Sequence, residues 1–179
     1  MIRAFLSLIL PGEEKSFNVL LEKRQAAMTM LKTIFRRALS DESDTVAAIA
    51  RKSRRHFLPY LPQLHSFEDD KIFYRNSVFP ECEVWVAEES QSLVGFCAFK
   101  EGWVDHLYLL PAQVGRSLGK TLLDKAKERH VFLQLWVFQR NRRAISFYER
   151  NGFQKVKVTD GSSNEERTPD ALYEWRRLP

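Results

Sequence analysis

The stretch "FQRNRRAISFYERNGF", residues 138–153, is the most informative part of the C-terminal half of the chain. It predicts a strand end, a helix opened by Asn141 and a Gly-Phe stop, because Asn is a preferred N-cap and glycine commonly ends a helix. One face of this helix carries Asn141, Ala144 and Tyr148. Seven residues make two turns to within about 20°, so the amide and the phenol lie roughly 10 Å apart along one face. Both groups can therefore contact one extended ligand; the alternatives are a Tyr half-buried against the sheet and a plain Asn N-cap.

The composition is that of an ordinary globular protein. A length of 179 residues suits one domain, and the apolar and charged fractions, 44% and 28%, are those of a chain with a packed core. The net charge of +5 favours an anionic ligand only weakly, because a mildly basic solvated surface explains it as well. No internal repeat at solenoid periods is visible.

The two cysteines, Cys82 and Cys97, both lie in apolar, strand-like runs. The chain has no CxxC motif and no Cys/His cluster, so we expect no metal site. We predict two buried, reduced thiols in a cytoplasmic protein. The alternative is a disulfide between them, which requires that the two strands pair. No segment is long enough to cross a membrane.

The opening "MIRAFLSLILPGEE" resembles a weak signal peptide, but its apolar run is short and no small-residue cleavage site follows. The pattern of residues 16–32 also allows a helix capped by Ser16. The first convincing strand begins only after Met30. We therefore predict an N-terminal extension over residues 1–30 and a single domain over residues 31–179.

The rest of the chain alternates strand and helix patterns. Strands are predicted at 33–38, 82–89, 92–102, 103–111, 131–138, 153–158 and 171–178, and helices at 41–57, from Ser66 onward, at 115–130 and from Asn141. The order is β-α-α-β-β-β-α-β-α-β-β. The unit from Trp103 to Phe138 requires parallel strands joined by a right-handed crossover, and the hairpins around it require antiparallel edges. The predicted fold class is α/β: a three-layer αβα domain with a mixed, mostly antiparallel seven-stranded sheet.

A strand-to-helix junction, "LYLLPAQVGRSLGKTLL" at residues 107–123, predicts an anion site. Backbone N–H groups at a helix start have no internal partners, and the helix dipole is positive there. Gly115 and Gly119 would let a phosphate approach, and Arg116 and Lys120 add positive charge. The spacing is neither a P-loop nor a GxGxxG motif. A glycine-containing turn that binds nothing remains the alternative.

Together the two stretches resemble the signatures of the GNAT (general N-acetyltransferase) superfamily. "HLYLLPAQVGRSLGKTLL" is similar to its acetyl-CoA loop, [QR]-x-x-G-x-[GA] after a strand and a Pro. "NRRAISFYERNGF" resembles its second signature, N-x-x-A-x-x-[FY]-Y-x-x-x-G-F. The likeness runs from about Thr33 to the C-terminus. In the loop, Val114 stands where Gln or Arg is usual and Ser117 replaces the middle Gly, so we expect weakened rather than lost binding.

The resemblance implies acetyl-CoA as co-substrate, without a metal, between the strand that ends at Pro111 and the strand 131–138. Tyr148 would be the general acid that protonates the departing thiolate. The implied cofactor-binding residues are Leu107, Tyr108 and Leu109 along the pantetheine, Gly115, Arg116, Ser117, Leu118, Gly119 and Lys120 at the pyrophosphate, and Asn141 beside the pantetheine.

An amine acceptor must lose a proton before it attacks, because an alkylamine is protonated at pH 7. Some relatives use a Glu where this chain has Trp136. Strand alternation puts Asp105 on the face of Leu107 and Leu109, and His106 on the other. We therefore name Asp105 as the catalytic base. A β-bulge would reverse this assignment, and bulk water could also take the proton.

The predicted function is transfer of acetyl to a primary amine of a small molecule or peptide, by direct attack in a ternary complex. The acceptor is unknown; candidate walls of its site are Phe57, Tyr60, His65, Trp85 and Trp103. The alternative is a catalytically weak GNAT-fold module that binds acetyl-CoA or a partner. A nucleic-acid-binding domain has only the charge in its favour. We expect neither nucleic acid nor a membrane as partner, and a homodimer stays open.

Overall fold

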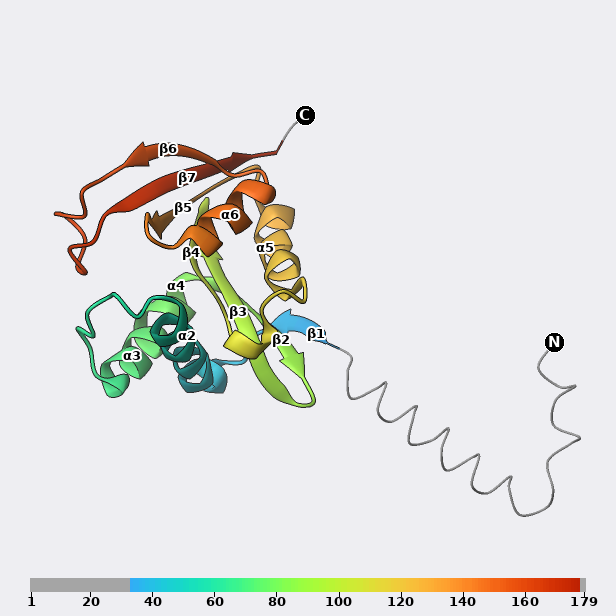
Figure 1. Cartoon of the computed structure of the whole chain (residues 1–179). Coiled ribbons are helices and arrows are strands. Elements are labelled where there is room, and N and C mark those ends of the chain that lie inside the picture. Colours follow the sequence, from blue (N-terminus) through green and yellow to red (C-terminus); the bar gives the residue numbers. More distant parts are fainter. Residues whose placement is uncertain (1–32, 178–179) are drawn as a thin grey trace, which may run out of the picture. The chain divides into compact units, whose positions relative to one another are not determined.

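The computed structural model describes residues 33–177, in which seven strands form one sheet (Figure 1). The strand order is β1-β2-β3-β4-β5-β7-β6. The strands are β1 (Ile34–Arg37), β2 (Glu83–Glu89), β3 (Ser92–Lys100), β4 (Trp103–Leu109), β5 (Phe132–Phe138), β6 (Gln154–Val158) and β7 (Asp170–Arg176). Within this part of the chain β4 and β5 are the parallel pair, and the other neighbours are antiparallel. The predicted mixed sheet and element order are confirmed.

Helices cover both faces of the sheet and make it a three-layer domain (Figure 1). They are α2 (Ser43–Phe57), α3 (Phe67–Phe73), a π-helical turn (Tyr74–Val78), α4 (Phe79–Glu81), α5 (Leu118–Arg129) and α6 (Arg142–Arg150), with short 3₁₀ turns at Ser40–Glu42 and Pro111–Gln113. The α2 side packs on Val84, Val86 and Phe96. The α5–α6 side packs on Leu133 and Leu135 of β5. One hydrophobic core therefore lies on each face.

The segment that begins with α3 has a helix cap that the sequence predicted and a π-helical turn that it did not predict. Ser66 caps α3: its hydroxyl accepts a hydrogen bond from the Asp69 N–H at 3.1 Å, and the Asp69 carboxylate accepts one from the Ser66 N–H at 2.9 Å. The π-helical turn that follows was not predicted, because apolar spacing does not distinguish a π turn from an α turn. It buries Tyr74 and Val78 against the α2 side of the sheet.

A β-bulge in β4 overturns the face assigned to Asp105. Ala98 of β3 lies opposite His106 but Phe99 lies opposite Val104, so Asp105 is an extra residue in the ladder. Its carboxylate accepts a hydrogen bond from the thiol of Cys82, which belongs to the α2-side core. Asp105 thus points away from Leu107 and Leu109, contrary to simple alternation.

The parallel strands β4 and β5 meet only near their start. Trp103 pairs with Gln134, and no later β4 residue is paired with β5 in the described part of the chain. On its other edge β4 remains paired with β3 up to Leu109. The sheet is therefore split between β4 and β5 on the side where β4 ends.

Both cysteines are free and buried, as predicted. Burial, with the nearby Asp105 carboxylate, raises the pKa of the Cys82 thiol to about 12, so it stays protonated at neutral pH. None of the helices between residues 33 and 177 has the length and hydropathy to span a membrane. The predicted N-terminal extension, with its open helix at 16–32, lies outside the described residues, and this domain boundary stays a prediction.

Candidate active site

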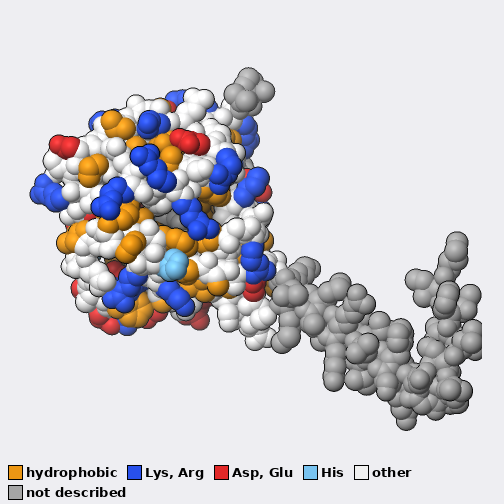
Figure 2. Space-filling view, in the orientation of Figure 1, with side chains coloured by type: hydrophobic (Ala, Val, Ile, Leu, Met, Phe, Trp, Pro, Cys, Tyr) orange, Lys and Arg blue, Asp and Glu red, His pale blue; other side chains and the backbone are white. Residues whose placement is uncertain are grey.

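A cleft of about 470 Å³, here called the donor cleft, lies among α2, the end of β4, the start of α5 and α6. Figure 2 shows the molecule hollowed between its α2–α3 part and its α6 part, with Lys and Arg side chains around the hollow. Nine of the predicted site residues line the cleft: Leu107, Tyr108, Leu109, Gly115, Ser117, Gly119, Lys120, Asn141 and Tyr148. The side chains of Asp105, Arg116 and Leu118 do not contribute to its wall.

The loop before α5 has the backbone that an anion site needs. Gly115 and Ser117 have φ angles of 92° and 63°, both in the left-handed region. Ser117 is the N-cap of α5, and Leu118 fills the core beneath it. The Arg116 guanidinium pairs with Glu89 at 2.8 Å, so its charge is turned away from the cleft. The expectation that Arg116 adds positive charge to the site is therefore corrected, whereas Lys120 does line it.

The α6 face is arranged as its sequence predicts. The Asn141 side-chain oxygen accepts a hydrogen bond from the Ala144 N–H at 3.1 Å and caps the helix. Tyr148 is buried, with its ring edge-on to Phe147 and Phe153. Burial raises the pKa of the Tyr148 phenol far above its usual value, so the hydroxyl keeps its proton throughout the physiological range.

Among residues 33–177, cations and no Asp or Glu line the donor cleft. Its basic side chains are Arg54, Lys120, Arg143 and Arg150. Arg143 also lies over the Phe57 ring at 5.1 Å, which links α6 to α2 across the cleft. Sequence reasoning missed the three arginines; the basic run in α2 and the two basic residues after Asn141 were the available signals. An elongated ligand with several phosphates fits this lining together with the free N–H groups at the start of α5.

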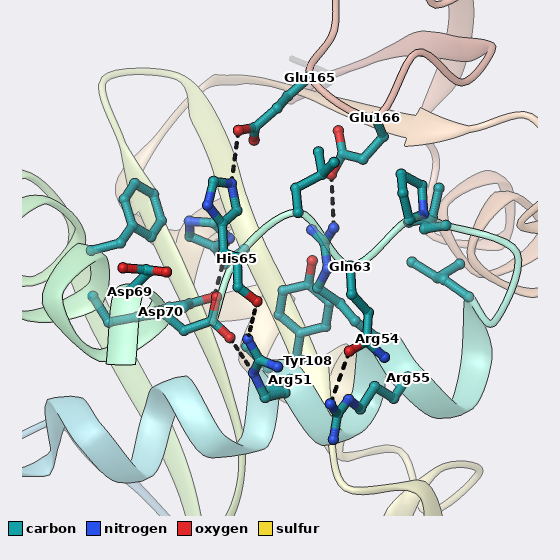
Figure 3. Close-up of a pocket in the computed structure, with 18 of the residues that line it drawn as sticks. Arg51, Arg54, Arg55, Gln63, His65, Asp69, Asp70, Tyr108, Glu165 and Glu166 are labelled. Atoms are coloured by element: carbon teal, nitrogen blue, oxygen red, sulfur yellow. Dashed lines mark hydrogen bonds and ion pairs between the residues drawn. The ribbon is translucent and has the colours of Figure 1, made fainter. Parts of the chain in front are cut away.

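A second cavity, here called the acceptor pocket, measures about 650 Å³ and lies among α2, α3, β4 and the β6–β7 loop (residues 159–169) (Figure 3). Arg54, Leu58 and Tyr108 line both cavities, so the two adjoin along this wall. Four carboxylates line the acceptor pocket: Asp69, Asp70, Glu165 and Glu166. Arg51, Arg54 and Arg55 also line it, so the acceptor pocket carries both charges, whereas the charged side chains that line the donor cleft are basic.

Ion pairs tie the β6–β7 loop across the acceptor pocket (Figure 3). Arg54 pairs with Glu166 at 2.7 Å, and His65 contacts Glu165 at 2.7 Å. On the floor, Arg51 pairs with Asp70 at 2.5 Å. The loop thus closes one side of the pocket through residues that are remote in the sequence.

His106 lines the acceptor pocket, which alternation alone did not reveal. Its Nδ1 lies 3.5 Å from the Tyr74 hydroxyl, and its ring stacks on Tyr108. Burial lowers the pKa of His106 to about 4, so the imidazole is neutral at pH 7. The alternation count was right that His106 faces away from Leu107, but that face carries the acceptor pocket.

Two of the five residues predicted to form walls of the acceptor site line one of these two cavities, and three do not. Phe57 lines the donor cleft, and His65 lines the acceptor pocket. Tyr60 lies under the Arg140 guanidinium at 4.2 Å, and neither it nor Trp85 nor Trp103 lines either cavity. No group of three or more His, Cys, Asp or Glu side chains in residues 33–177 is arranged to hold a metal ion.

Comparison with known proteins agrees with this geometry. Residues 80–155 match the family model of the acetyltransferase (GNAT) domain. Peptidyl-lysine N-acetyltransferase YiaC of Escherichia coli is 32% identical over 102 residues, which cover 56% of this chain and 68% of YiaC. The chain belongs to the GNAT acetyltransferase family. Peptidyl-lysine N-acetyltransferase YjaB of Salmonella typhimurium is 30% identical over 128 residues, or 71% of this chain and 85% of YjaB.

The GNAT fold is also seen in solved structures. The PaiA N-acetyltransferase of Thermoplasma acidophilum, determined in complex with coenzyme A, aligns with a TM-score of 0.64 and 22% identity over 82% of this chain and 99% of its own. Family membership confirms the predicted N-acetyltransferase activity and, with it, acetyl-CoA as the acetyl donor. The roles of the individual site residues, the cytoplasmic location and the homodimer stay predictions.

Proposed function

We propose that this GNAT enzyme acetylates the ε-amine of lysine side chains in peptides, by direct attack in a ternary complex. The observation that carries this proposal is the shared wall of two unlike cavities: a donor cleft that, in the described part of the chain, is lined by cations and no carboxylate, and an acceptor pocket with four carboxylates. An anionic thioester suits the basic donor cleft, and the acceptor pocket is the one of the two that offers carboxylates to a cationic amine. The names of the peptidyl-lysine relatives agree with this acceptor class.

In this proposal the donor cleft holds acetyl-CoA, which supplies an activated acetyl group. The backbone of Leu107, Tyr108 and Leu109 runs beside the pantetheine, because that edge of β4 has no partner in β5. Asn141 and Tyr148 face the pantetheine from α6. The pyrophosphate is held by backbone N–H groups at the start of α5, in Gly115, Arg116, Ser117, Leu118, Gly119 and Lys120.

The lysine side chain enters from the acceptor pocket and meets the thioester at the shared wall. Its alkyl stem packs on Leu58 and Tyr108, and its charge is balanced on entry by the pocket's carboxylates. Arg54 stands in this wall, held by Glu166 and beside the Tyr108 hydroxyl. The wall orients the two reactants, and such positioning supplies a large part of the rate enhancement in bimolecular reactions.

Two groups of this chain handle protons in the proposal. Tyr148 donates to the departing thiolate, since its buried phenol is protonated at every working pH. For the amine, His106 is better placed than the predicted Asp105. His106 lines the acceptor pocket, whereas the Asp105 carboxylate lies 3.5 Å from Lys100 and lines neither cavity. A neutral imidazole does not repel the incoming ammonium and can accept a hydrogen bond that orients it, while the proton itself passes to water.

The test combines cofactor binding with turnover on matched amines. We expect acetyl-CoA to raise the melting temperature, and thiol release to occur with a single-lysine peptide but not with the same peptide carrying norleucine. An N-acetylated peptide blocks the α-amine, so only the ε-amine reacts. A thermal shift without thiol release on any amine would instead favour the catalytically weak acetyl-CoA-binding module. Thiol release with a free polyamine but not with the peptide would show that the acceptor is a small polyamine and not a peptide lysine.

A further inference from the structure

A third cavity of about 560 Å³ continues the acceptor pocket along the outside of α2. We call it the basic groove and define it by Arg51, Lys52, Arg55, His56 and Phe67. No Asp or Glu of the described part of the chain lines it. Arg51 and Arg55 line both the groove and the acceptor pocket, so a chain that reaches one cavity can continue into the other.

The positive charge of the basic groove is only partly compensated. Arg51 pairs with Asp70, but among residues 33–177 no carboxylate pairs with Lys52 or Arg55. Arg55 donates a hydrogen bond to the neutral side chain of Gln63 at 3.0 Å. Lys52, Arg55 and His56 are all exposed. Within the part of the chain that the structure describes, the groove therefore offers two cations without a carboxylate partner directly beside the proposed lysine site.

The groove's cations come from the solvent face of one helix. Ala50 and Ser53 of α2 are buried, which turns Lys52 and Arg55 outward. These two residues are three positions apart, so they are neighbours on the helix surface, about 4.5 Å apart along its axis. Alternate side chains of an extended peptide are about 7 Å apart. One acidic side chain, or two alternate ones, can therefore reach both cations.

We propose that the basic groove binds an acidic segment of the substrate peptide beside the acetylated lysine, so that the enzyme prefers lysines with Asp or Glu close in sequence. This inference rests on the proposed peptidyl-lysine acceptor. The continuity of the groove with the acceptor pocket favours a peptide over a detached anion. The Phe67 ring, with 41% of its residue surface exposed, adds an apolar contact for the same segment.

Nucleic acid is the other polyanion that such a groove could attract. A single-stranded nucleic acid would need aromatic faces for its bases. Among the described residues that line the groove, Phe67 and His56 are the aromatic ones, and the cations of Arg51 and Lys71 lie over the Phe67 ring at 5.7 and 5.5 Å. The groove therefore suits carboxylates better than stacked bases.

The experiment compares two N-acetylated peptides of equal length, each with one lysine, that differ only in charge. One has Asp and Glu on both sides of the lysine, and the other has Asn and Gln at the same positions. We expect the wild-type enzyme to show a KM lower by on the order of fivefold or more for the acidic peptide, with similar kcat. This preference should shrink as the salt concentration rises.

Lys52→Glu tests the groove itself, since Lys52 lines neither the donor cleft nor the acceptor pocket. We expect it to abolish the preference for the acidic peptide and to leave the KM for the neutral peptide and for acetyl-CoA unchanged. Lys155→Glu on β6 is the matched control: it changes the net charge equally at an exposed site outside the groove.

Four results would overturn the inference. Equal KM values for both peptides, or an equal loss of preference in Lys52→Glu and Lys155→Glu, would refute the groove's role and leave the proposed function standing. A single-stranded RNA that competes with the acidic peptide and loses affinity in Lys52→Glu would assign the groove to nucleic acid. If neither peptide is acetylated although acetyl-CoA binds, the proposed function itself fails, and this inference with it.

Discussion

Asn141 and Tyr148 line the same cleft from one face of α6, two helical turns apart. The amide is fixed because it caps the helix at Ala144, and the phenol is fixed because it is buried against Phe147 and Phe153. A pair held so firmly at two points along an open cleft fits an elongated ligand rather than a compact one. The following predictions test this arrangement and its surroundings.

Tyr148→Phe should lower kcat by on the order of 10²- to 10⁴-fold with little change in the acetyl-CoA KM, because it removes a general acid and almost no volume. Tyr173→Phe is the matched control: this tyrosine is also buried, but its hydroxyl bonds to Glu149 and it lines neither cavity. Steady-state kinetics on a verified lysine peptide measures both. Equal turnover of Tyr148→Phe and wild type would leave Tyr148 as a packing residue.

Ser117→Gly should stabilise the protein by about 1 kcal/mol and keep or strengthen acetyl-CoA binding. Ser117 has a φ of 63°, where a residue with a Cβ is strained and glycine is not. Chemical denaturation and isothermal titration measure the two effects. Ser117→Ala keeps the Cβ and should not gain stability. A large loss of binding in Ser117→Gly would mean that the hydroxyl makes a contact of its own with the ligand.

Gly119→Glu should weaken acetyl-CoA binding at least 100-fold, whereas Gly119→Ala should bind nearly normally. A Cβ at this position would touch Leu109 and Phe147 at 3.5 and 3.6 Å, which are ordinary contacts. A longer side chain must extend into the donor cleft, where a carboxylate opposes the phosphates. Titration calorimetry compares the affinities, and circular dichroism checks the fold. Unchanged affinity in Gly119→Glu would place the ligand elsewhere.

His106 should make the protein less stable as the pH falls. Its pKa is about 6.5 when unfolded and about 4 when folded, so the unfolded state binds more protons between these values. The resulting stability is complete above pH 6.5 and is lost towards pH 4. Burial is the main cause of the lowered pKa of His106. The charges of Arg54 and Lys100 lower this pKa further, and the Asp105 carboxylate raises it.

Between pH 7.5 and 4.5 we therefore expect the free energy of unfolding to fall by about 2–3 kcal/mol more in wild type than in His106→Gln. Urea denaturation at the two pH values gives the difference. His56→Gln replaces an exposed histidine and should follow wild type. Parallel pH curves for wild type and His106→Gln would show that His106 is solvated in the folded protein.

A chain that begins at Leu31 should fold and bind acetyl-CoA with an unchanged thermal shift. The described unit starts with β1 at Ile34 and carries a hydrophobic core on each face of its sheet. The experiment compares the melting temperature of this chain with that of the full-length protein. An insoluble or unfolded product would contradict the predicted domain boundary at residue 30.

The element order, the α6 face and the loop before α5 could be predicted from the amino-acid sequence. These features depend on local chemistry: the Asn141 cap and the spacing to Tyr148 are set within two helical turns, and the Pro111 stop and the capping box at Ser66 lie within a few residues of the ends that they mark. The position of Ser117 where a glycine is usual also agrees with its left-handed backbone.

The groups that face the acceptor pocket could not be predicted without the three-dimensional structure. Asp105 and His106 share the α2 side because the pairing of β3 with β4 inserts a bulge, and the sequence of β4 alone does not record that register. The acceptor pocket is closed by contacts between residues 100 and 112 positions apart, His65 with Glu165 and Arg54 with Glu166. Such contacts depend on where the chain returns in space, so no local pattern predicts them.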